Sequence, residues 1–178
     1  MSLTPSWDLF IILFFVVTVA YGFILQRERC VMTLLATYVA IVVTLAIAGS
    51  AQQFFAGDKT ILNQVWIRSN ASPFTIQAAI FIVTIIILTA RSGLKNSGTG
   101  RGIITPIEIF GFSFLNAGLI LATLFSFLPV SDQISFANAS KLASLIIKYQ
   151  TWWIVLPVIL MIITGFKRLR GGAVPPPQ

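Results

Sequence analysis

The apolar positions of the chain gather into long runs separated by short polar stretches. The first run covers residues 7–25 and the second residues 30–49, with only Gln-Arg-Glu-Arg at 26–29 between them. Each run is close to the roughly 20 residues that a helix needs to cross the hydrocarbon core of a bilayer. Neither has a continuous polar face, so a soluble fold could not cover them. The pattern predicts two spanning helices that lie side by side and antiparallel, joined by a tight turn at the headgroups.

Three further apolar runs follow, at residues 74–90, 105–128 and 151–166. Ser72-Pro73 is typical of a helix start, with serine as the N-cap and proline in the first turn. Pro129 ends the fourth run, and Pro157 predicts a kink in the fifth. We therefore expect an all-α membrane protein with about five transmembrane helices. They form a single domain over residues 1–170, and a disordered Pro-rich tail follows at 171–178.

Two stretches between the runs mix apolar and polar residues in an amphipathic pattern. The first, residues 51–70, fits either a helix in the headgroup plane or an ordinary connecting loop. The second, residues 130–149, fits an interfacial or re-entrant helix. Tyr149, Trp152 and Trp153 then form an aromatic belt where the fifth run begins.

Composition and charge support lipid as the solvent. Hydrophobic residues make up 57% of the chain and charged residues 10%, against about a quarter in a typical soluble domain. The net charge of +7 does not indicate a nucleic-acid partner, because no long basic stretch is interleaved with aromatic residues. Eight of the twelve Lys and Arg residues fall on one side of a five-span topology. The positive-inside rule then predicts an N-terminus outside and a C-terminus in the cytoplasm. The first apolar run lacks a basic lead and a clean cleavage site, so we read it as a retained span and not as a signal peptide.

The residues available for chemistry are few. The chain has no histidine and one cysteine, which excludes His-based acid–base catalysis and His/Cys metal sites. Thr105 and Glu108 match a capping box, with Pro106 in the first turn, so Glu108 is expected to bond the backbone of Thr105. Asp8 fits a carboxylate that complements the dipole of its own helix; the alternative is a functional acid at the membrane edge. We expect no catalytic residue, no metal and no cofactor.

The fourth run carries small residues and one amide in an apolar setting. Asn116 must find hydrogen-bond partners inside the bundle, either on another helix or, as the alternative, in a polar cavity. Gly111, Gly118 and Ala122 form a small-residue stripe beside it. The second run offers a matching surface of small and hydroxyl residues, namely Thr33, Ala36, Thr37, Ala40, Thr44 and Ala48. The sequence predicts that the second and fourth spans pack on these two stripes.

The first two runs also resemble the colicin V production family of bacterial inner-membrane proteins. The resemblance lies in Trp7-Asp8, Gly22-Phe23, Arg27-Glu28 and the later Leu-Asn-Ala-Gly-Leu at 115–119. The chain departs from the family at residues 23–26, which replace a basic, glycine-rich turn, and in its fifth span and Pro-rich tail. The resemblance implies a non-enzymatic protein of toxin export or envelope maintenance. It marks Asp8, Gly22, Arg27 and Glu28 as motif positions.

Three classes of function remain after these observations. The sequence favours an accessory or structural membrane protein that works through packing, lipid contact and partner helices. Its expected partners are membrane lipids and either other membrane subunits or further copies of itself. A small oligomeric channel or transporter is the alternative, although transport usually needs ionisable groups deep in the spans. A membrane enzyme fits least, because the carboxylates lie near helix ends or in loops.

Overall fold

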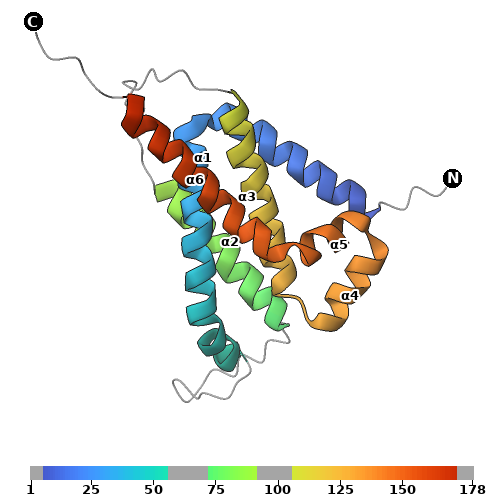
Figure 1. Ribbon diagram of the computed structural model, residues 1–178. Coiled ribbons are helices and arrows are strands. Elements are labelled where there is room, and N and C mark those ends of the chain that lie inside the picture. Colours follow the sequence, from blue (N-terminus) through green and yellow to red (C-terminus); the bar gives the residue numbers. More distant parts are fainter. Residues whose placement is uncertain (1–5, 56–71, 92–105, 172–178) are drawn as a thin grey trace, which may run out of the picture.

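The computed structural model describes residues 6–55, 72–91 and 106–171. These residues contain no strand and form six helices (Figure 1): α1 (Trp7–Phe55), α2 (Pro73–Arg91), α3 (Pro106–Ser126), α4 (Val130–Ala139), α5 (Lys141–Lys148) and α6 (Gln150–Gly171). Four helical segments are long and apolar enough to cross a membrane, and a fifth is added if α5 and α6 count as one bent span. The expected all-α class with four to five spans is confirmed.

The first two predicted spans belong to one helix of 49 residues. Its halves, Trp7–Ile24 and Arg29–Gln53, each qualify as a span. Figure 1 shows α1 bending sharply between them, after which the halves diverge. The predicted tight turn and side-by-side hairpin are therefore wrong. The physical reason is that Gln, Arg and Glu at 26–29 are good helix formers, and neither glycine nor proline lies among them to end the helix.

Helix α3 runs between the two halves of α1 and provides the centre of the bundle (Figure 1). It makes its most extensive contacts with α1. In the most apolar 18-residue stretch of α3, 56% of the residues are buried, against 11% in Trp7–Ile24 and 11% in the corresponding stretch of α2. Its ends follow the predicted signals, with Pro106 in the first turn and Pro129 just beyond the end. The predicted start of α2 is also confirmed, because the Ser72 hydroxyl accepts from the Thr75 N–H at 3.3 Å.

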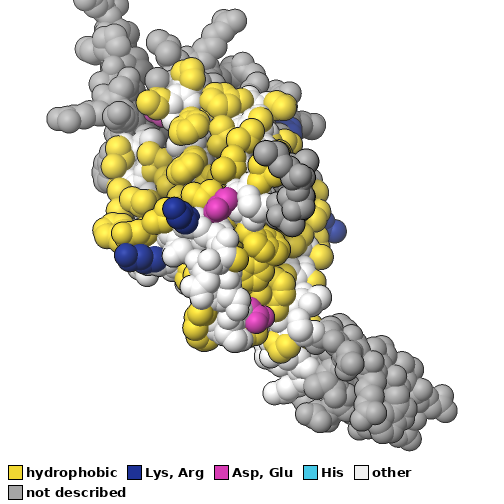
Figure 2. All heavy atoms as spheres, turned by 90° about the vertical axis from the view of Figure 1, so that its right-hand side faces the viewer, with side chains coloured by type: hydrophobic (Ala, Val, Ile, Leu, Met, Phe, Trp, Pro, Cys, Tyr) yellow, Lys and Arg dark blue, Asp and Glu magenta, His cyan; other side chains and the backbone are white. Residues whose placement is uncertain are grey.

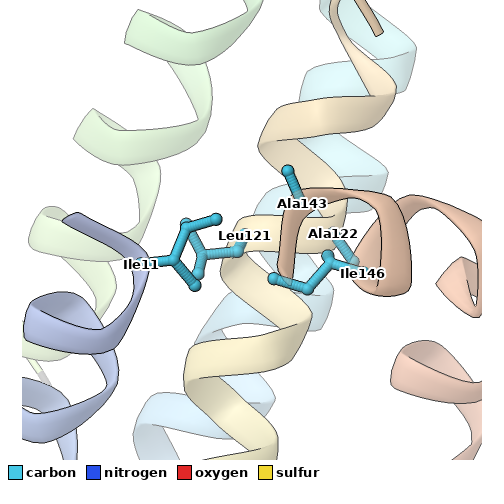
Figure 3. Packing of buried hydrophobic residues seen from close by; sticks show 5 residues of the cluster. All are labelled: Ile11, Leu121, Ala122, Ala143 and Ile146. Carbon is cyan, nitrogen blue, oxygen red and sulfur yellow. The ribbon is translucent and has the colours of Figure 1, made fainter. Parts of the chain in front are cut away.

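Two clusters of buried apolar side chains attach the halves of α1 to opposite ends of α3. Near the bend, Cys30 and Leu34 pack with Ile109, Phe112 and Leu119. The other cluster, shown in Figure 3, joins the first half of α1, α3 and α5 through five residues: Ile11, Leu121, Ala122, Ala143 and Ile146. Each half of α1 therefore has its own contact with α3.

The amphipathic stretch at 130–149 forms two helices, α4 and α5, with extended backbone at Ser140 between them. Helix α5 then meets α6 at a bend of 67°, the geometry of a broken span or a re-entrant loop. The main change of direction thus lies at Tyr149, and α6 continues through the buried Pro157 as one helix. In the turn that Pro157 interrupts, the Tyr38 hydroxyl of α1 donates to the Ile154 carbonyl at 2.5 Å. Most of 51–70, Thr105 and the tail at 172–178 lie outside the described residues.

The helix ends sort into two groups at opposite ends of the bundle. Figure 1 shows the bend of α1, the end of α2, the start of α3 and the end of α6 toward the upper left. The start of α1, the start of α2, the end of α3, and α4 and α5 lie toward the lower right. This grouping is the one that five crossings of the membrane require.

The second and fourth predicted spans do pack together, with Thr37 of the second-span stripe bonded to Asn116 of α3. The glycines of the α3 stripe, however, face α6 and not the second span. A Cβ on Gly118 would overlap the Trp153 ring and lie 2.8 Å from its Cδ2, and one on Gly111 would lie 3.4 Å from a Leu160 methyl. Ala122 packs in the cluster with Ile11 and α5. The stripe was assigned to the wrong neighbour because small residues mark a close approach without identifying the partner helix.

Gly118→Ala should therefore destabilise the protein, by about 1–3 kcal/mol for an overpacked core. The Trp153 ring cannot retreat freely, because it packs against Phe15 and Phe114. Gly49→Ala is the matched control, since nothing lies within 4 Å of its added methyl. That change should raise stability by up to about 1 kcal/mol. Thermal unfolding in detergent compares the two, and equal effects would contradict the close contact.

Candidate functional site

The most buried polar contact of the bundle joins α1 to α3. The Thr37 hydroxyl lies 3.0 Å from Asn116 Oδ1 and 2.9 Å from the Thr33 carbonyl, so it can donate to either oxygen. Thr37 is fully buried and Asn116 is 5% exposed. The interhelical bond expected of Asn116 is present, and its partner Thr37 comes from the second half of α1. Ala40, one turn further along, is also fully buried.

A second polar contact lies at the crossing of α1 and α3 near the bend. The Cys30 thiol donates to the Gly22 carbonyl at 3.4 Å and lies 3.6 Å from the Ser113 hydroxyl. A Cβ on Gly22 would overlap that hydroxyl and lie 2.7 Å from Ser113 Cβ. Gly22 is therefore the point of closest approach between the two helices. This gives a packing reason for glycine at a position that the sequence marked only by resemblance.

Asp8 holds the start of α5. Its Oδ1 accepts from the Ser140 hydroxyl at 2.5 Å and from the Leu142 N–H at 3.1 Å. Ser140 in turn accepts from the Ala143 N–H at 3.0 Å, as an N-cap does. The carboxylate thus complements the positive end of α5 as well as that of its own helix. Ser140 has the type and place of an N-cap in the sequence, but nothing local connects it with a carboxylate 132 residues away.

The remaining predicted positions contribute less. Glu108 lies in the first turn of α3 and is half-buried, while its predicted capping partner Thr105 is outside the described residues. Arg27 and Glu28 lie on the helical bend of α1, and their side chains are likewise not described. For these two family-motif positions, the structure therefore describes only a helical backbone.

The buried polar groups of the described residues are all uncharged, being hydroxyls and one amide: Thr37, Thr44, Ser113, Asn116, Thr123, Ser140 and Thr164. Within the same residues, no group of three His, Cys, Asp or Glu is placed to hold a metal ion. Most of these hydroxyls bond backbone carbonyls of their own helices or side chains of a neighbour. Bonds within a helix satisfy these hydroxyls in lipid, whereas the Thr37–Asn116, Cys30–Ser113 and Asp8–Ser140 contacts link different helices.

Comparison with protein-family models, with curated proteins and with solved structures finds no match to this chain.

The Thr37–Asn116 contact is best measured by a double-mutant cycle. Thr37→Val and Asn116→Leu remove the two polar partners while keeping most of the volume. We expect a coupling energy of about 0.6 kcal/mol, and at most about 1.7 kcal/mol, as found for hydrogen bonds between membrane helices. Reversible unfolding in mixed micelles measures the four proteins. Strictly additive effects would show that the bond does not couple the helices.

Removal of the α5 cap should loosen α4 and α5 selectively. Ser140→Ala deletes both hydrogen bonds of the buried hydroxyl and should cost about 1 kcal/mol, the usual effect of losing an N-cap. Ser135→Ala is the control, because its exposed hydroxyl bonds only the Ser131 carbonyl in the same helix. Hydrogen exchange should rise in residues 140–148 for Ser140→Ala alone. The same exchange pattern in both variants would argue against the cap.

Proposed function

We propose that this chain is a non-enzymatic integral membrane protein that acts as an accessory or structural component of a membrane assembly. The proposal includes its resemblance to the colicin V production family and hence a role in the envelope or in export. It also places the chain in a bacterial inner membrane, with the N-terminus outside and the C-terminus in the cytoplasm. Orientation rests on the positive-inside rule applied to the eight Lys and Arg residues that share one side.

One observation carries the proposal: the described bundle leaves its first span, like α2, largely uncovered. In Trp7–Ile24, 11% of the residues are buried. Its exposed side chains are large and apolar, among them Leu13, Val16 and Val17, each 57–59% exposed. Lipid or another helix must cover this surface. A protein built to associate with partner helices offers such a surface.

The second candidate is a small oligomeric channel or transporter, and one feature favours it. The 67° bend between α5 and α6 has the geometry of a broken span. Transporters place substrate sites at such breaks, usually in pairs at corresponding positions of two repeats. No second break of this kind occurs in the described residues, which is why the accessory role ranks first.

Affinity purification in mild detergent, followed by mass spectrometry, tests the accessory role. We expect a membrane partner in stoichiometric amounts. Val16→Trp on the uncovered first span should reduce its recovery several-fold. Val42→Trp, on a still more exposed position of the second half, should leave recovery unchanged.

A homo-oligomer that carries no other protein would contradict the accessory role. In that case flux measurements in liposomes would decide the channel alternative. Loss of the partner in both tryptophan variants would instead indicate general misfolding, which thermal unfolding in detergent detects independently.

A further inference from the structure

An apolar cavity of about 280 Å³ lies between α1, α2, α3, α4 and α5. Six of the side chains that line it are Trp7, Phe10, Phe74, Leu124, Phe136 and Ala143. The rings of Trp7 and Phe136 meet edge to face at a centroid distance of 4.7 Å. Five separate helices therefore converge on this space.

The cavity is unsuited to water and suited to hydrocarbon. A buried water needs two to four polar partners, and the lining side chains named above are apolar. Apolar cavities stay dry, and one of about 150 Å³ is enough to bind benzene. This cavity has nearly twice that volume, so it can take a flexible alkyl segment. If the cavity stayed empty, the side chains that line it would lose van der Waals contacts on that side.

The cavity opens at the surface of the bundle. Trp7 is 48% exposed and Phe10 is 56% exposed, although both also line the interior space. They lie at the start of α1, the end of the bundle where α4 and α5 also lie (Figure 1). An exposed tryptophan at the end of a span is typical of the membrane–water interface. A chain entering here would leave its headgroup at that interface.

One acidic and one basic residue lie near each other at this end of the bundle. Asp8 directly follows Trp7, and Lys141 lies close enough to Asp8 for their charges to interact. Figure 2, which faces the start of α1 together with α4 and α5, shows basic and acidic side chains next to each other among hydrophobic ones. Asp8 Oδ1 is already engaged by Ser140 and Leu142, while the Lys141 side chain is exposed. The exposed ammonium of Lys141 lies beside this carboxylate and is the cation there that a phosphate can contact.

We propose that this cavity binds one acyl chain of a membrane phospholipid, whose phosphate lies at Lys141. The site combines apolar lining for the chain with a cation for the headgroup, as expected for recognition of a lipid rather than a free anion. It depends only on a membrane location of the bundle and not on the accessory role. Failure to recover a protein partner would therefore leave this inference untouched.

Native mass spectrometry of the purified protein tests the acyl-chain site. The probes are dioleoyl phosphatidylglycerol and dioleoylglycerol, which share their chains and differ in the phosphate. The wild type should retain one phosphatidylglycerol per chain, saturably. Leu124→Trp fills the cavity and should weaken retention at least tenfold, whereas Val83→Trp on the exposed face of α2 should retain the lipid. Retention by the wild type that does not saturate would overturn the proposal without recourse to any variant. Equal lipid retention by the Leu124→Trp and Val83→Trp proteins would also overturn it.

The phosphate contact has its own pair of variants. Lys141→Ala should weaken phosphatidylglycerol about tenfold and leave dioleoylglycerol unchanged. Lys148→Ala, at the other end of α5, should affect neither lipid. Equal losses of both lipids in Lys141→Ala, or no loss at all, would overturn the assignment of the phosphate to Lys141.

Discussion

The structure depends on the packing of α3 inside the angle of α1. Because α1 stays helical through its charged bend, its two halves cannot close on each other and must find another helix to cover their inner faces. Helix α3 meets that requirement. Gly22 permits the close approach at Ser113, and Leu34 and Ile11 pack at opposite ends of α3. The other helices then add to the outside of this pair.

Polar contacts in the bundle follow from the cost of leaving such groups unpaired in an apolar medium. A hydroxyl can bond a carbonyl of its own helix, as Thr123 and Thr164 do, and then needs no partner helix. Among the described residues, the buried Thr44 hydroxyl and the Trp153 indole N–H are the exceptions that have no hydrogen-bond partner. The Asn116 side chain instead bonds a side chain of another helix, and its Oδ1 accepts from the Thr37 hydroxyl across the interface between α1 and α3. Asp8 lies where the start of α5 supplies N–H and hydroxyl donors. Uncharged groups therefore lie within the bundle, and the described carboxylates lie at its ends.

The sequence predicted what local signals determine and failed where the tertiary partner decides. Apolar runs located the spans, and proline and serine located the starts of α2 and α3. The interhelical role of Asn116 followed from its amide alone. The bend of α1 was missed because a charged patch between two apolar runs is compatible with either a turn or a continuous helix. Sequence patterns paired Gly118 with the wrong helix and predicted no contact between Ser140 and Asp8. No pattern within one segment identifies a contact residue that is far away in the chain.

The proline of α6 has a consequence for how the bundle is built. Pro157 has no N–H to donate to the carbonyl four residues before it, and a backbone group left unpaired in hydrocarbon costs several kcal/mol. The Tyr38 hydroxyl reaches the adjacent carbonyl, of Ile154, in that interrupted turn. Helix α6 therefore receives a hydrogen bond from α1 in the turn that contains the proline. The turn that Pro157 interrupts is thus held from outside its own helix, by a side chain that lies 116 residues earlier in the chain.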